Sequence, residues 1–167
     1  MRLTSVMSHV GLATACCAVV VIGKGQADRP FVPDKDNVPP TTDVRIFNAA
    51  GLQGSIKANQ TGRLLEGNQL FSLNLLHRTG EDVTVHGSVV DLYFIQEGSA
   101  VLEHGGTAMD LKPGGGREGD MRGSAINGGT KTVVKKGDVV FIPPGVPHRF
   151  VAGESDVWYL NAHFPGK

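Results

Sequence analysis

The stretch GDVVFIPPGVPH, residues 137–148, decides the fold of this chain. A Gly-Asp turn opens four apolar residues, and Pro143-Pro144-Gly145 then bends the chain before His148. Because proline donates no hydrogen bond to a central ladder, this bend predicts a corner or an edge of a β-sheet. The pattern therefore predicts two short strands, 138–142 and 148–152, with His148 held at the start of the second.

The rest of the chain continues this alternation of short apolar runs and turn residues. No window shows a period of 3.6 residues over three turns, so little helix is expected. Further strands are predicted at 62–65, 70–77, 82–86, 91–96, 100–103, 132–134 and 157–162. Strands of this length and spacing predict an all-β chain that forms a sandwich or a barrel. Its core is expected to contain Phe71, Phe94, Phe141 and Phe150.

A glycine-rich segment interrupts the predicted strands. Residues 113–129 contain seven glycines and few apolar side chains. We interpret this segment as part of a long loop, about residues 104–130, and loops of that length are often lids or simply mobile.

The first 27 residues predict a secretory signal peptide. Arg2 is followed by an apolar run over 10–23, and small residues at 25 and 27 precede Asp28. A membrane anchor that stays attached is the alternative, although the run is shorter than the ~20 apolar residues of a spanning helix. Residues 28–45, rich in proline, are expected to form an extended arm, and 46–167 the barrel.

Composition limits the functions available to the exported chain. Both cysteines, Cys16 and Cys17, lie within the predicted signal peptide, which excludes disulfides, thiolate metal sites and a cysteine nucleophile from the rest. Sixteen basic residues balance sixteen acidic ones, so no basic face for nucleic acid is expected. No membrane contact is expected after signal removal, and the localisation is expected to be periplasmic or secreted.

The opening stretch resembles the second conserved motif of the cupin superfamily, G-x5-P-x-G-x2-H-x3-N. It matches at Gly137, Pro143, Gly145 and His148, and it departs at the last position, where Ala152 replaces asparagine.

An upstream stretch resembles the first cupin motif, G-x5-H-x-H-x3,4-E-x6-G, through Gly80, His86 and Gly98. Asp91 replaces the glutamate, and one histidine stands where two are expected. Counted from Gly80, the second histidine position is Ser88; counted from Asp91, the first is Thr84.

The resemblance covers residues 70–164 and implies a single antiparallel β-barrel or jelly roll of the cupin type, with an interior site. The surviving ligand types are His86, Asp91 and His148, a two-histidine-one-carboxylate set typical of Fe(II), with Mn, Ni or Zn as further candidates. In the alternative interpretation the site has lost its metal and the two histidines bind a small molecule directly. Thr84, Ser88 and Tyr93 are candidate pocket residues.

Three histidines fall outside the motifs, namely His77, His104 and His163. His163 follows the last predicted strand; a position near the mouth of the barrel is the alternative, but it is interpreted as a surface residue.

Cupins include oxygenases, isomerases, lyases and binding proteins, so the fold alone does not define the activity. Two hypotheses follow: a metal-dependent enzyme of one of these types acting on a small molecule, or a non-catalytic cupin that binds a sugar or organic acid without metal. A homodimer is expected, because exposed sheet edges seek partners.

The signal peptide is directly testable. We expect the exported protein to begin near Asp28, because signal peptidase cuts after small residues such as Ala27. N-terminal sequencing of the protein secreted by a bacterial host measures this. Soluble cytoplasmic protein that keeps Met1 would contradict the hypothesis.

Overall fold

The computed structural model describes residues 44–67, 71–115 and 117–166. The predicted signal peptide and nearly all of the predicted arm lie outside these residues. The elements are the helix α1 (Ala49–Lys57) and the strands β1 (Arg63–Gly67), β2 (Ser72–Arg78), β3 (Val83–Val85), β4 (Val89–His104), β5 (Thr107–Met109), β6 (Lys112–Pro113), β7 (Met121–Gly123), β8 (Ala125–Asn127), β9 (Thr130–Lys135), β10 (Val139–Ile142), β11 (His148–Phe150) and β12 (Asp156–Pro165).

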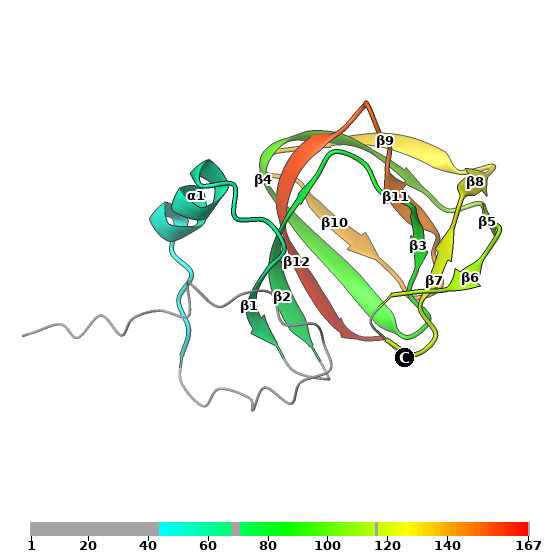
Figure 1. Ribbon diagram of the computed structural model, residues 1–167, viewed down its shortest axis with the longest axis horizontal. Coiled ribbons are helices and arrows are strands. Elements are labelled where there is room, and N and C mark those ends of the chain that lie inside the picture. The colour runs from blue at the N-terminus through cyan, green and yellow to red at the C-terminus, as the bar shows by residue number, and fades with distance from the viewer. Residues whose placement is uncertain (1–43, 68–70, 116, 167) are drawn as a thin grey trace, which may run out of the picture.

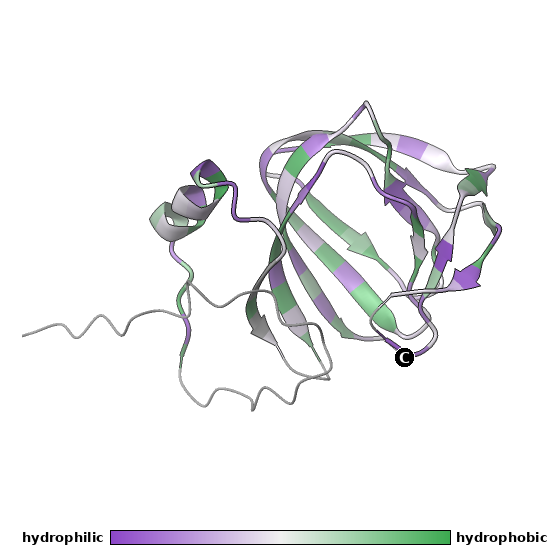
Figure 2. Cartoon of the chain, viewed as in Figure 1, coloured by the Kyte–Doolittle hydropathy of each residue, from purple (hydrophilic) through white to green (hydrophobic). Residues whose placement is uncertain are grey.

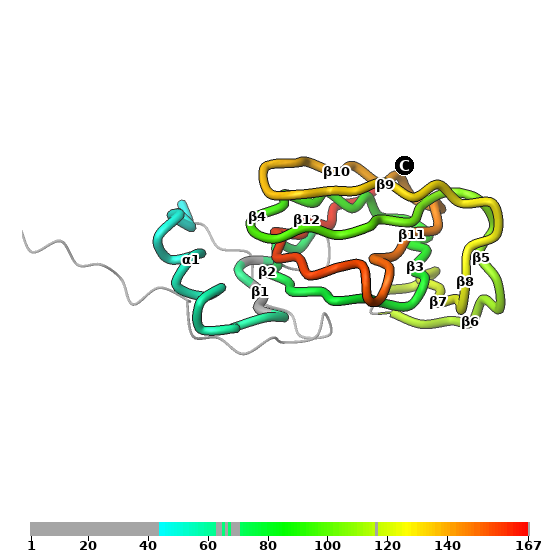
Figure 3. Tube along the Cα trace, turned by 90° about the horizontal axis from the view of Figure 1, so that it is seen from above, coloured from blue at the N-terminus to red at the C-terminus, as the bar shows by residue number. Residues whose placement is uncertain are grey.

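The strands form an antiparallel β-barrel of the jelly-roll kind, as predicted (Figure 1). The main sheet has the order β1-β2-β12-β4-β11-β3-β7-β6, and β9 and β10 also pair with β4. Strand β4 is long enough to belong to both walls of the barrel. Its first part pairs with β12 and β10, and its last part pairs with β9 and β11. Figure 3 shows the two walls from above, with the strands enclosing the interior.

The predicted break between 96 and 100 is wrong, because β4 continues through it. Gly98 adopts φ +77°, and a Cβ atom there would lie 2.0 Å from the carbonyl oxygen of Asp156. The paired strand shifts register next to this position, between Trp158 and Tyr159. Glycine therefore bends the strand at a bulge and lets the two backbones meet, and it does not end the strand.

The glycine-rich segment is a second correction. Instead of one long loop it contains four strands of two or three residues, β5 to β8. Strand β8 pairs with β5, and β7 pairs with both β3 and β6. Strands this short do not repeat the alternation of apolar and polar residues, so the sequence pattern could not reveal them.

Two apolar clusters hold the fold together. The larger one fills the barrel with side chains from both walls, among them Tyr93, Phe150 and Tyr159. The smaller one lies on the outer face of β2 and β12, where Leu75 and Trp158 pack under the helix α1. Figure 2 shows apolar and polar residues alternating along these strands, as expected for strands with an inner and an outer face. Within the described residues, no helix has the length and apolar character needed to cross a membrane.

The expected phenylalanine core is only partly right. Phe150 is fully buried, but Phe71, Phe94 and Phe141 are 38%, 36% and 60% exposed. Phe141 and Ile142 are neighbours on β10: Ile142 is buried, and Phe141 points outward. An unbroken apolar run such as 139–142 does not show which residues face inward, because both faces carry apolar side chains.

The two phenylalanines Phe150 and Phe141 form a matched pair for a stability test. Phe150→Ala should lower the free energy of unfolding by about 3–5 kcal/mol, because a buried ring leaves a cavity. Phe141→Ala should cost less than about 1 kcal/mol, since its ring already contacts water. Urea unfolding of both variants at equal protein concentration measures the difference. Equal losses would show that the orientation of β10 is wrong.

Candidate metal centre

One wall of the barrel brings a carboxylate and an imidazole into the interior. Asp91 on β4 is the ladder partner of His163 on β12, and His163 is the partner of Ser72 on β2. Directly paired residues of neighbouring strands share a face of the sheet. The side chain of Asp91 is only 1% exposed, so its charge depends on protein partners.

The opposite wall supplies a second row. His148 on β11 is paired with Thr84 on β3, and Thr84 is paired with Arg122 on β7. His86 follows β3 immediately and lies two residues beyond Thr84, which places it on the same face by the two-residue period of a strand. Proline-rich residues just before β11 fix the position of His148, as the opening motif predicts.

The three residues predicted as ligands converge between these walls. The Oδ2 atom of Asp91 lies 3.4 Å from Nε2 of His86 and 3.2 Å from Nε2 of His148. One ligand atom from each residue lies within 4.8 Å of the other two, and all three residues are buried. The structure thus brings His86, Asp91 and His148 together as a potential metal-binding group.

In His86 and His148, the hydrogen bond on the side of the ring away from Asp91 determines which nitrogen carries the proton. The Nδ1 atom of His86 lies 2.8 Å from Oδ1 of the buried Asp120, and Nδ1 of His148 lies 3.0 Å from the carbonyl oxygen of Val146. Both partners accept hydrogen bonds, so both Nδ1 atoms donate. In the neutral ring the lone pair then lies on Nε2, the atom that faces Asp91.

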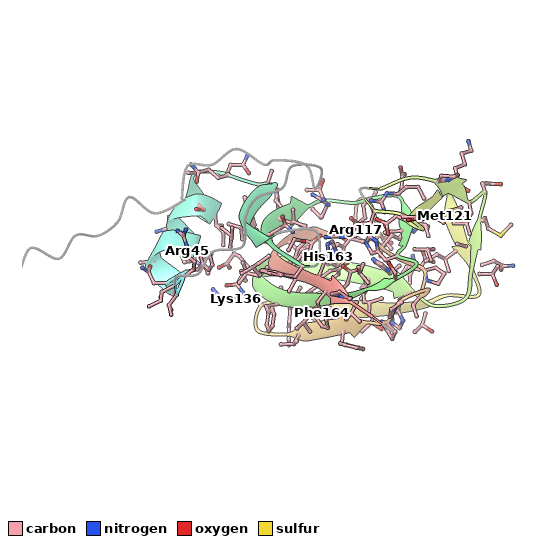
Figure 4. The ribbon with its side chains drawn as sticks, turned by 90° about the horizontal axis from the view of Figure 1, so that it is seen from below. Arg45, Arg117, Met121, Lys136, His163 and Phe164 are labelled. Atoms are coloured by element: carbon pink, nitrogen blue, oxygen red, sulfur yellow. The ribbon has the colours of Figure 1, made fainter. Side chains whose placement is uncertain are left out.

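His163 has the opposite arrangement, and the expectation of a surface residue is wrong. Its side chain is 15% exposed, and its Nε2 atom contacts Oδ1 of Asp91. The guanidinium of Arg117 lies 2.9 Å from Nδ1 of His163, and Figure 4 shows the two side chains next to each other. Because a guanidinium only donates, Nδ1 accepts and Nε2–H donates to Asp91. His163 therefore orients the carboxylate, whereas His86 and His148 face its other oxygen.

The electrostatics follow from burial and these contacts. Burial raises the pKa of Asp91, but hydrogen bonds from His148 and His163 outweigh it and hold this pKa well below its usual range. Burial lowers the pKa of His86 more strongly than Asp91 and Asp120 raise it, so its ring is neutral at pH 7. For His148, burial is outweighed by the hydrogen bond to Asp91, and the pKa is raised.

The predicted pocket residues have different positions. Thr84 is buried, and its hydroxyl accepts a 2.5 Å hydrogen bond from Arg122. Tyr93 is buried in the core, with its ring centroid 6.3 Å from that of His148. Ser88 is exposed, in the turn before β4, because the strand period that would point it inward ends at β3.

Sequence reasoning missed three residues of the centre. His163 was recoverable, because extending the last strand by one residue places it on the face of Tyr159 and Asn161. Asn161 donates from Nδ2 to Oδ1 of Asp91 at 3.3 Å. Asp120 follows the glycines of a segment without periodic pattern, so no sequence signal marked it.

The chemistry of the donor set fits a divalent transition metal. Two imidazole nitrogens and one carboxylate oxygen are suitable ligands, and each imidazole has the outer hydrogen bond that metal-binding histidines usually have. The Oδ1 atom of Asn161 is buried and has no hydrogen-bond partner among the described residues. This atom offers an acceptor for a polar group bound in the centre.

Comparisons with known proteins agree on the fold. The structure is similar to that of BH2720 from Bacillus halodurans, with a TM-score of 0.50 and 17% identity over 81% of this chain and 88% of that one. Weaker likenesses are to the cupin protein BF4112 from Bacteroides fragilis (TM-score 0.40, 16% identity, 58% of this chain and 67% of that one) and to a predicted oxalate decarboxylase from Thermotoga maritima (0.38, 19%, 59% and 67%). No protein-family model matches the sequence, and no curated protein matches it significantly. The likeness to BH2720 concerns the fold alone at this identity, and it agrees with the single β-barrel or jelly roll that the sequence predicts.

The opposite proton arrangement of the imidazoles is testable without metal. We expect His86 to carry its proton on Nδ1 and His163 to carry it on Nε2, because their Nδ1 atoms face a carboxylate and a guanidinium respectively. Long-range ¹⁵N–¹H correlation spectra of metal-free protein at about pH 8, above the usual histidine pKa, distinguish the two tautomers.

Single His→Gln variants assign the signals in these spectra. The same tautomer at His86 and His163 would contradict the hydrogen-bond directions described above.

Proposed function

We propose that this protein is a cupin-fold metalloprotein in which His86, Asp91 and His148 bind one divalent transition metal. We further propose that it is an enzyme of the oxygenase, isomerase or lyase type that acts on a small molecule. The metal supplies Lewis acidity at coordination positions that three protein ligands leave open for an oxygen-bearing ligand.

One observation carries the proposal: two buried imidazoles direct their Nε2 atoms at the same oxygen of the Asp91 carboxylate. Their Nδ1 atoms are already committed as donors to Asp120 and to Val146. A lone pair 3.4 Å from a carboxylate oxygen, as at His86, is unfavourable unless a cation lies between them. The raised pKa of His148 also supports a bound cation, because it shows that the surroundings of Asp91 favour a positive charge.

The remaining residues of the centre would hold these ligands in place. His163 and Asn161 both donate to Oδ1 of Asp91, which leaves Oδ2 directed at the two imidazoles. Asp120 orients His86, and a carboxylate in that role also increases the basicity of the ring. Burial of all three ligands excludes bulk water from the protein side of the centre.

We also propose that the protein works outside the cytoplasm, in the periplasm or after secretion. The proposal rests on the signal-peptide pattern of the first 27 residues and on the confinement of both cysteines to that segment.

Metal analysis of protein purified without a histidine tag tests the proposed site. After anaerobic loading with Fe(II), Mn(II), Ni(II) or Zn(II), the wild type should hold about one metal ion per chain by mass spectrometry. His86→Gln and His148→Gln should abolish binding, because each removes a nitrogen ligand. Asp120→Ala should weaken binding about 10–100-fold, because it frees the ring of His86.

His77→Gln is the matched control. His77 is paired with Asp156 and stacked on Trp158 on the outer face of the barrel, so metal content should not change. Wild-type protein that takes up none of the four metals would contradict the proposal and favour a binding protein without metal. A loss of metal in His77→Gln equal to that in His86→Gln would contradict the assigned ligands.

A further inference from the structure

We propose that the ligand of this centre is a small carboxylic acid, a 2-hydroxy or 2-oxo acid, whose carboxylate is bound by Arg122. The inference deepens the proposed function, because it assumes that the second oxygen of the acid is directed at the metal position. It rests on the placement of Arg122, on its lack of an acidic partner and on the charge of the centre.

The ladder places Arg122 beside the ligands. Arg122, Thr84 and His148 are paired in a row across three adjacent strands and therefore share the inner face. The guanidinium extends toward β3, because its Nη1 atom donates to the hydroxyl of the buried Thr84 at 2.5 Å. Thr84 lies on the strand between β7 and β11, so the residue that accepts from the guanidinium is itself the ladder partner of His148. A small molecule held by Arg122 would therefore lie beside the strand that carries His148.

The backbone of the segment before β7 packs against the side chain of Arg122. A Cβ atom on Gly114 would lie 2.8 Å from Cγ of Arg122, so the backbone of residue 114 contacts the aliphatic part of the side chain. The side chain is half-buried, and its direction is restricted on both sides, by Gly114 and by Thr84. Such restriction lowers the entropic cost of binding a ligand to an otherwise flexible side chain.

Arg122 has no carboxylate partner among the described residues. Two other half-buried arginines have one: Arg149 lies 2.7 Å from Glu103, and Arg78 lies 3.2 Å from Glu81. The nearest acidic group in the same segment, Asp120, binds His86 and the backbone N–H of Arg117. A half-buried guanidinium that protein acids do not neutralise is a suitable site for an anion.

The charge of the centre favours the same ligand. Two carboxylates, Asp91 and Asp120, face the site, and the two positive charges of a divalent metal would offset theirs. The positive charge of Arg122 then favours an anion beside it. A carboxylate is the anion that matches the planar fork of a guanidinium, with two parallel N–H···O hydrogen bonds. The unpartnered Oδ1 of Asn161 can accept from the hydroxyl of a 2-hydroxy acid.

Calorimetric titration of the metal-loaded full chain with lactate, and with its neutral isostere lactamide, tests the inference. The wild type should bind lactate about 10–100-fold more tightly than lactamide, because a charge-assisted pair is lost in the amide. Arg122→Gln should reduce lactate affinity by the same factor and leave lactamide affinity nearly unchanged. Arg122→Lys should keep part of the lactate affinity, because lysine retains the positive charge but lacks the two parallel N–H donors of the guanidinium.

Lys136→Gln is the charge-matched control. Lys136 is 60% exposed and paired with Glu97, in the turn between β9 and β10. It should bind lactate as the wild type does, whereas an equal loss there would indicate a general charge effect and overturn the inference. Each variant is compared at equal metal occupancy and after circular dichroism shows a folded barrel.

The outcomes separate the two proposals. Equal affinity for lactate and lactamide, equal affinity in wild type and Arg122→Gln, or no binding of either lactate or pyruvate overturns the carboxylate site, whatever the metal content. Protein that takes up no metal but binds lactate through Arg122 refutes the metal centre and supports the carboxylate site.

Discussion

The structure depends on one buried carboxylate. Asp91 is in the interior of a barrel, where an unpaired charge would cost several kcal/mol, so its partners are a condition of the fold. Both walls contribute them: His163 and Asn161 come from β12, and His148 comes from β11. The same contacts that stabilise the ionised group also arrange imidazole nitrogens around one of its oxygens. Stability and site geometry therefore have the same origin.

The long strand β4 makes this arrangement possible. It begins in one wall, next to β12 and β10, and ends in the other, next to β9 and β11. Gly98 allows the change of direction, because only a residue without a side chain tolerates the backbone of Asp156 at that distance. A carboxylate near the start of such a strand lies within reach of both walls. The position of Asp91 in the sequence thus determines that the centre is in the barrel.

Strand spacing and turn residues predicted an all-β chain, and the resemblance to the two cupin motifs implied the barrel and the convergence of His86, Asp91 and His148. Sequence reasoning failed where tertiary pairing decides. The orientation of Phe141 depends on which face of β10 turns outward, and an apolar run does not contain that choice. His163 was missed because the last strand was expected to end one residue earlier. Asp120 belongs to a glycine-rich segment whose pairing with β3 is set by the barrel, since its own residues show no periodicity.

The segment before and within β7 has a thermodynamic consequence. It carries both Asp120, which orients the ring of His86, and Arg122, whose guanidinium donates to Thr84, the ladder partner of His148. Only three ladder pairs attach β7 to β3, so the two side chains are ordered together. If the metal or the anion orders the short hairpin of β6 and β7, binding of the other ligand costs less conformational entropy. Linkage then requires the effect to be mutual: an anion at Arg122 and a cation at His86 would increase each other's affinity by the same factor.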